Sequence, residues 1–311
     1  MSRVVCLGAA LQDIFLASQG DIPLRNKIQS GEKTEVDQAT YCVGGGGINT
    51  AVSLARHDHE TILMSSIAHD VCGATVLELL DQENIDSSYM QIIDEGQTGC
   101  SIILVDQDDD SAILTYYGTA TQYNDLDEHD LELIHPDWLY ITTLGGDFDT
   151  LNRFCDKARE LNCKVMFNPG NLELANTKAL IAFLSKVDIL LVNKEEASQI
   201  VSGQLPEELL EQLQRHVETV IITADVMGGI ASDGNEIWRF GLYEHTKVID
   251  TTGAGDAFGA GFLAHYLSGH SFSDSLIFAS ANSTSVIGDL GATTGVLSSH
   301  TELHPMPIQQ L

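Results

Sequence analysis

The sequence contains few basic residues. Its 311 residues include 15 lysines and arginines against 45 aspartates and glutamates, which gives a formal net charge of −30 at pH 7. A surface this negative repels phosphate backbones and anionic membranes, so we expect neither nucleic acid nor a membrane as a partner. The acidity fits a salt-rich habitat and simple acidic drift equally well, because net charge governs solubility and association rather than fold.

The sequence also contains no long hydrophobic run and no closely spaced cysteine pair. The apolar stretches at 181–184 and 187–192 are interrupted by polar residues and fall short of the ~18 residues that a membrane-spanning helix needs. The six cysteines form no Cys-x-x-Cys pair, so the sequence supports neither a disulfide framework nor a structural zinc site. The N-terminus has no signal-peptide pattern, and we therefore expect a cytoplasmic protein.

The sequence does contain enough apolar residues, 43%, to build a folded core. They form short strand patterns that alternate with helical patterns, which predicts a largely parallel sheet with helices on both faces. Two strand-rich segments, at about 14–42 and 98–118, interrupt this alternation and predict a small β lid, with a turn at the DQDDD run. We expect a single domain over residues 1–311, with one of its helices at 254–267.

The segment IDTTGAGDAFGAGF, at 249–262, combines a strand end, a glycine turn and the start of a helix. Because a helix N-terminus presents unpaired N–H groups and a positive dipole end, the amides around Gly253, Ala254 and Gly255 are suited to bind phosphate. A carboxylate at Asp256 would repel that phosphate unless it acts as the base of a phosphoryl transfer. The alternative is that Asp256 only stabilises the helix N-terminus. The glycine spacing fits neither a dinucleotide fingerprint nor a P-loop.

A second glycine motif, VGGGGINTAVSLARHDH at 43–59, precedes another predicted helix. Its four glycines permit a close approach of a ligand, and Asn49 in the first turn offers both a donor and an acceptor to hydroxyl groups. The alternative is a flexible loop followed by a helix-capping asparagine.

Together, the motifs GGGGINTAVSLAR and DTTGAGDAFGAGF resemble the two signatures of the PfkB carbohydrate kinase family, the ribokinase-like sugar and nucleoside kinases. The resemblance covers essentially the whole chain. It implies a ribokinase-like three-layer αβα sandwich with a β lid, and a kinase that uses ATP and Mg²⁺ to phosphorylate an alcohol group. It also implies that Asp256 is the catalytic base, and that the amides of Gly253, Ala254 and Gly255 form the anion hole for the γ-phosphate.

The same resemblance assigns the acceptor site. The early segment GAALQD, at 8–13, makes Asp13 the acceptor for two sugar hydroxyls, although a lone aspartate after a strand is more often a turn residue. Gly45, Gly46 and Asn49 would line the same site. Asp250 and Thr252 would belong to a potassium site beside the anion hole.

The nucleotide site is implied by four further positions. The run LVNKEEASQI resembles the family's N-x-x-E element, in which Asn193 and Glu196 organise magnesium and phosphates largely through water. The residues alone fit a helix N-cap with an acidic first turn equally well. Thr223 matches a position near the phosphates, and Asn282 matches one that lines the adenine pocket. Asp225 stands where the family often has a glycine and a basic residue, which predicts an altered nucleotide affinity or preference.

The chain departs from ribokinases proper in ways that bear on the acceptor. Gly46 replaces a lysine, and the TTLGGD segment at 142–147 has no match to the glutamate that holds ribose. Because a sugar phosphate needs a basic clamp and the lid segments hold few lysines and arginines, we expect a neutral sugar. A nucleoside kinase, with Phe15, Tyr116 or Tyr117 stacked on a base, is the first alternative. A catalytically silent sugar- or nucleotide-binding protein is the second. The family also suggests a homodimer joined through the lid.

Overall fold

The structure, a computed structural model, describes residues 2–18, 24–105 and 112–311. Its large sheet has the strand order β15-β14-β13-β12-β11-β10-β9-β1-β4. All pairs from β12 to β4 are parallel, and β13, β14 and β15 continue the sheet antiparallel. The strands are β1 (Arg3–Leu7), β4 (Glu60–Met64), β9 (Trp138–Ile141), β10 (Lys164–Phe167), β11 (Ile189–Asn193), β12 (Thr219–Thr223), β13 (Gly229–Ser232), β14 (Ile237–Phe240) and β15 (Ile308–Gln310).

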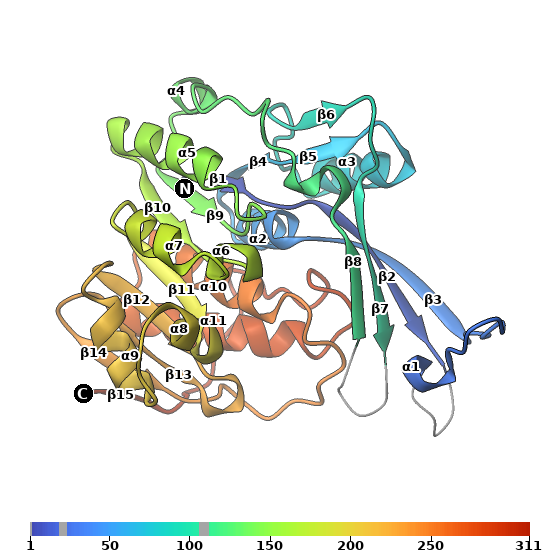
Figure 1. The fold of residues 1–311 in the computed structure, drawn as a ribbon. Coiled ribbons are helices and arrows are strands. Elements are labelled where there is room, and N and C mark those ends of the chain that lie inside the picture. The colour runs from blue at the N-terminus through green and yellow to red at the C-terminus, as the bar shows by residue number, and fades with distance from the viewer. Residues whose placement is uncertain (1, 19–23, 106–111) are drawn as a thin grey trace.

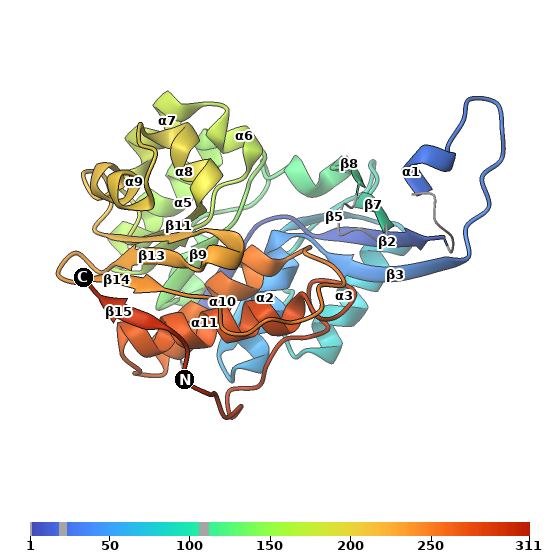
Figure 2. The same cartoon turned by 90° about the horizontal axis from the view of Figure 1, so that it is seen from below.

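Helices cover both faces of this sheet, as Figure 2 shows. One face carries α2 (Gly46–Arg56), α3 (Val71–Gln82), α10 (Ala254–Leu267) and α11 (Phe272–Val286). The other carries α5 (Phe148–Glu160), α6 (Asn171–Leu174), α7 (Thr177–Leu184), α8 (Lys194–Ile200) and α9 (Pro206–Leu213). The predicted helix at 254–267 is confirmed as α10.

Each face has its own hydrophobic core, because successive side chains of a strand point to opposite sides. In β1, Val5 and Leu7 join the core under α5 and α7, while Val4 and Cys6 join the core under α2 and α10. Strands buried on both faces read as continuous apolar runs, which is why the sequence predicts them well.

A second, four-stranded sheet projects from the body (Figure 1). Its order is β3-β2-β7-β8, with β2 (Leu11–Ala17), β3 (Gln38–Gly44), β7 (Gly99–Val105) and β8 (Ala112–Tyr116). We call this sheet the lid. Strand β2 begins at Leu11 rather than near residue 14, so Asp13 lies within a lid strand and not in a turn. The expected turn at the DQDDD run, 106–110, lies outside the described residues.

The smaller elements are α1 (Leu24–Lys27), α4 (Asp130–Ile134), the 3₁₀ helices η1 (Gly118–Thr121) and η2 (Asp225–Met227), and the short pair β5 (Ser66–Ala68) and β6 (Gln91–Ile93). Over the described part of the chain, every helix is too short or too polar to traverse a bilayer.

Candidate active site

The residues singled out from the sequence gather where the parallel strands of the large sheet end. Strand β11 ends at Asn193 and β12 ends at Thr223, and these two residues are paired in the parallel register. The N-termini of α2 and α10 reach the same region, where Asn49 contacts Asp256. In open parallel sheets, ligands bind beyond the carboxyl ends of the strands.

The first turn of α10 has the geometry of an anion site. Gly253 caps the helix in the left-handed region, with φ 76°, and a Cβ on it would lie 2.2 Å from Cβ of Ala292. Glycine is therefore required here both by the backbone conformation and by the space. A Cβ on Gly255 would meet no heavy atom within 4 Å, so the protein leaves space beside this part of the turn. A bulky anion can approach the first-turn amides from that side.

Asp256 is held by Asn49, a residue that lies 207 positions away in the sequence. The Nδ2 group of Asn49 donates to Oδ2 of Asp256 at 2.8 Å, and Asn49 itself is only 4% exposed. Burial raises the pKa of Asp256, and the hydrogen bond from Asn49 lowers it. The Oδ1 atom of Asn49 is buried without a hydrogen-bond partner in the structure. Asn49 thus orients a carboxylate and keeps one acceptor available for a hydroxyl donor.

Asp13 brings a second carboxylate to the site from the lid. It is 4% exposed, and its pKa is raised to about 6, mainly by burial and also by Asp250 and Asp256, against a hydrogen bond from Ser101 that lowers it. Strand β3 makes room for it, because a Cβ on Gly44 would lie 1.9 Å from Oδ2 of Asp13. Carboxylates from a lid strand and from helix α10 therefore face one region that hydroxyl donors would stabilise.

The glycines before α2 let the backbone pack closely. Gly45 has φ 93°, and a Cβ on it would lie 2.5 Å from the carbonyl oxygen of Ala9. A Cβ on Gly46 would lie 2.8 Å from Oγ1 of Thr142, so a lysine there would collide with the end of β9 unless the backbone moved. Close packing against Thr142 is thus a reason for glycine rather than lysine at position 46.

Asn193 and Glu196 form a reciprocal capping box at the start of α8. Oδ1 of Asn193 accepts from the Glu196 N–H, and Oε2 of Glu196 accepts from the Asn193 N–H, both at 2.8 Å. This is the N-cap arrangement that the sequence leaves open. Burial raises the pKa of Glu196, the Asn193 N–H lowers it, and Glu195 and Asp256 raise it further. The charge of Asp256 therefore acts on Glu196 across the ends of the strands.

Asp250 organises the loop that leads into α10. Its Oδ1 accepts from the backbone N–H of Thr252 at 3.0 Å and from Oγ1 of Thr252 at 2.7 Å. Its Oδ2 accepts from the N–H of Gly291 at 3.1 Å. The carboxylate, 4% exposed, thereby links two loops beside the anion site.

The remaining two predicted residues lie in contrasting places. Asp225 has φ 44° at the start of η2 and is exposed beside Val226 and Met227, after the end of β12. Asn282 is fully buried, and its amide bonds to Ala257 and Ser53 and accepts from the N–H of Leu297. In this conformation the Asn282 side chain joins α2, α10 and α11, and its contact with adenine stays a prediction.

Sequence reasoning did not find Glu173, a fully buried carboxylate on α6. It accepts from Oγ1 of Thr143 and from the N–H groups of Leu144, Gly146 and Gly170 at 2.7–3.0 Å. The segment at 142–147, which lacks its own glutamate, thus receives one from a later helix. The signal was weak, since NPGNLE reads as an ordinary loop followed by a short helix.

Comparison with known proteins finds relatives over nearly the whole chain. A family model described as pfkB family carbohydrate kinase matches residues 1–299. A nucleoside kinase of Methanocaldococcus jannaschii is 26% identical over 300 residues, covering 95% of this chain and 94% of that protein. An ATP-dependent ribose-1-phosphate kinase of Halopiger xanaduensis is 27% identical over 305 residues, covering 94% of each.

Two solved structures have the same fold. Ribokinase of Arabidopsis thaliana, complexed with ribose and ATP, superposes with a TM-score of 0.81 at 20% identity and covers 96% of each chain. The Methanocaldococcus jannaschii nucleoside kinase, described as an archaeal member of the ribokinase family, superposes with a TM-score of 0.78 at 23% identity and the same coverage. The expected ribokinase-like fold is confirmed.

Proposed function

The chain belongs to the pfkB family of carbohydrate kinases, and from that premise we propose that it transfers the γ-phosphoryl group of ATP to an alcohol group of a neutral sugar. The observation that carries the proposal is the placement of Asp256. It lies in the first turn of α10, bonded to Asn49 and within electrostatic reach of both Asp13 and Glu196. A base, an acceptor-binding carboxylate and an anion site thus converge on one region.

In this proposal Asp13 accepts hydrogen bonds from two hydroxyls of the sugar, and the free Oδ1 of Asn49 accepts another. Asp256 takes the proton of the attacking hydroxyl as its oxygen bonds to the γ-phosphorus, and the bond to ADP breaks. The raised pKa of Asp256 makes it a better proton acceptor than an ordinary aspartate. The amides around Gly253, Ala254 and Gly255 stabilise the charge on the transferred group.

Magnesium fits the opposite side of the same region. Glu196 is a carboxylate whose pKa is raised by burial and by neighbouring acids, and its bond to Asn193 engages Oε2. Oxygen donors of this kind suit Mg²⁺, which keeps several of its waters. We propose that Glu196 and Asn193 hold the ion through water, and that Thr223 and Asp225 border the nucleotide phosphates. The ion would neutralise phosphate charge. We also propose that potassium activates the enzyme through the loop organised by Asp250 and Thr252.

The negative charges of the carboxylates at the site favour a neutral acceptor. Asp250 and Asp256 already raise the cost of ionising Asp13, as its raised pKa records. A phosphate on the acceptor would add two negative charges to this cluster. A nucleoside is the second candidate because of the exposed rings of Tyr116 and Tyr117 on the lid. Phe15, by contrast, is 2% exposed and has no free face for a base.

We further propose a homodimer that pairs two lids. The lid's outer strands, β3 and β8, expose the large apolar side chains Tyr41, Ile113, Leu114 and Tyr116, each at least 53% accessible. Exposed edge strands with apolar side chains are favoured sites for pairing with a second chain. The cytoplasm stays our expected location, in keeping with six free cysteines.

The test is ADP release from ATP and Mg²⁺, with and without potassium, across neutral sugars, sugar phosphates and nucleosides. Asp256→Asn should lower kcat by about 10²–10⁴-fold while acceptor binding is retained. Asp149→Asn is the matched control, because Asp149 is an exposed first-turn aspartate of α5. If Asp256→Asn lowers kcat no more than Asp149→Asn does, Asp256 only stabilises the N-terminus of α10. If no acceptor supports ADP release although ligands bind, the result would favour a catalytically silent sugar- or nucleotide-binding protein.

A further inference from the structure

Histidines line a second hollow at the far ends of the two helices that begin at the active site. Helix α2 ends at Arg56, next to His57, and α10 ends at Leu267, between His265 and His270. Two adjoining cavities of about 460 and 380 Å³ share His265 and His270 as lining residues, together with Phe278 of α11 and Ser299. Since His265 lies nine residues after Asp256 on α10 and a helix rises about 1.5 Å per residue, the hollow lies about 14 Å from Asp256 along the helix.

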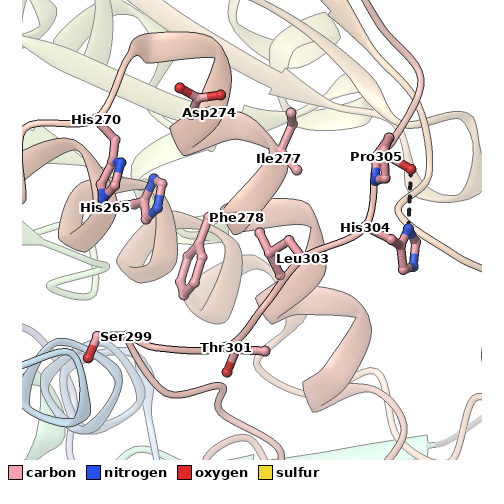
Figure 3. Close-up of a pocket in the computed structure, with 10 residues that line it drawn as sticks. All are labelled: His265, His270, Asp274, Ile277, Phe278, Ser299, Thr301, Leu303, His304 and Pro305. Atoms are coloured by element: carbon pink, nitrogen blue, oxygen red, sulfur yellow. Dashed lines mark hydrogen bonds between the residues drawn. The ribbon is translucent and has the colours of Figure 1, made fainter.

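One wall of the hollow is a stack of rings. The rings of His265 and His270 stack with centroids 3.6 Å apart, and Phe278 stacks on His265 at 4.7 Å. His57 contacts Phe278 edge-on at 5.1 Å. Figure 3 shows His265, His270 and Phe278 beside the C-terminal segment that carries Ser299 and Thr301. A flat ring can pack against such an aromatic cluster.

Two nitrogens in this wall have no hydrogen-bond partner. His57 is 4% exposed, and its Nδ1 contacts the carbonyl oxygen of Ser53 at 2.5 Å. Because a carbonyl oxygen only accepts, Nδ1 carries the proton and Nε2 is left as a buried lone pair without a partner. Nδ1 of His265 is likewise buried and unpartnered. Neighbouring His59 differs, since its Nε2 contacts the carbonyl oxygen of Ala264 and its Nδ1 accepts from the N–H of Ser2.

These imidazoles are neutral near pH 7. Burial lowers the pKa of His57, and burial together with His270 lowers that of His265 to about 4. A neutral imidazole with an unpartnered lone pair is an acceptor that needs a hydrogen donor or a metal ion. Among the described residues, no group of three or more histidine, cysteine or acidic side chains is arranged to hold a metal ion. The lone pair on Nε2 of His57 therefore calls for a hydrogen donor.

The charge of the lining residues indicates which hydrogen-donating ligand fits the hollow. Asp58 and Asp274 border the hollow, and among the residues that the structure describes no lysine or arginine lines either cavity. An anion is disfavoured there, all the more in a chain with a net charge of −30. We propose that the hollow is a second ligand site for a neutral, amino-substituted heteroaromatic ring, of which a purine base is the simplest example. Its ring packs against the exposed ring of His270 at the end of the stack, and an N–H group donates to the unpartnered Nε2 of His57.

The test is titration calorimetry of the full chain with adenine. His270→Ala removes an exposed ring of the stack, and His57→Asn keeps a donor for Ser53 while deleting Nε2. Each should weaken adenine binding about tenfold, the scale of losing one stacked ring or one buried hydrogen bond. His69→Ala, an exposed histidine outside the hollow, and Asp13→Asn, which disables the proposed acceptor site, should bind adenine as the wild type does. Purine, which lacks the amino group, should bind more weakly than adenine.

Each other outcome overturns the proposal. Binding that is lost in Asp13→Asn but kept in both histidine variants would place adenine in the active site alone. Zinc binding that depends on His57 or His270, with no adenine binding, would make the hollow a metal site. AMP binding as tightly as adenine would refute the charge argument, and the absence of any adenine binding would refute the site. Adenosine distinguishes a base from a nucleoside as the ligand.

Discussion

Replacing Asp13 with asparagine should stabilise the protein, and the gain should grow with pH. The structure holds the Asp13 carboxyl at a pKa of about 6, against an ordinary value of 3.8. An acid whose folded pKa is raised binds more protons in the folded state, so ionising it above that pKa destabilises the fold. The cost is nearly absent below pH 3.8, increases between 3.8 and 6, and is complete above pH 6.

The magnitude follows from the size of the shift. Each unit of pKa difference corresponds to about 1.4 kcal/mol, so the carboxylate costs about 3 kcal/mol at pH 8 and about 1.5 kcal/mol at pH 5. Asparagine has nearly the same shape and carries no charge, and it can keep a hydrogen bond with Ser101. The free energy of unfolding of Asp13→Asn should therefore exceed that of the wild type by about these amounts.

Urea unfolding of the ligand-free protein at several pH values between 5 and 8 measures this difference. Asp149→Asn is the control, because an exposed first-turn carboxylate should change the stability by less than about 1 kcal/mol, in the opposite direction. A difference between Asp13→Asn and wild type that does not vary with pH would refute the reasoning. So would a variant that is less stable than the wild type at pH 8.

Three further outcomes are expected. Asn49→Ala removes a hydrogen bond to the Asp256 carboxylate that is worth about 1.5–3 kcal/mol. The acidic limb of the kcat–pH profile should therefore move up by about 1–2 pH units. A limb that does not move would contradict Asp256 as the base. Glu173→Gln puts an amide before four donors, and urea unfolding should show a loss of about 2–4 kcal/mol, whereas Glu160→Gln on the exposed end of α5 should show almost none. Leu114→Lys should convert the dimer to monomer in light scattering; a wild type that is already monomeric would refute lid pairing.

The parallel sheet could be predicted from the sequence because its strands are buried on both faces and read as apolar runs. The first turn of α10 could be predicted as well, since Gly253 has the positive φ that a glycine turn suggests. The contact between Asn49 and Asp256 could only be inferred through family resemblance, because no local pattern joins residues 207 positions apart. Glu173 was missed for the same reason, as its partners lie in an earlier loop.

Asn282 shows what position in a helix leaves open. The family resemblance implies that it lines the adenine pocket, and in the structure its amide bonds to α2, α10 and the chain at Leu297. Gly261 of α10 allows the approach, since a Cβ there would lie 3.1 Å from Asn282. Periodicity places such a residue on the buried face but does not say whether its partners are protein or ligand.

The acidic cluster connects folding with function. Asp13 comes from lid strand β2 and Asp256 from helix α10, and each has its pKa raised by burial, so ionising both carboxylates carries a cost to stability. That cost can persist because the site is framed by well-packed elements: α2 and α10 share a core, and Asn282 fastens α11 to both. Hydroxyl donors of an acceptor and the cation that accompanies ATP would both relieve it. Ligand binding should therefore stabilise a fold that the buried carboxylates destabilise. A variant such as Asp13→Asn should gain stability and lose substrate affinity.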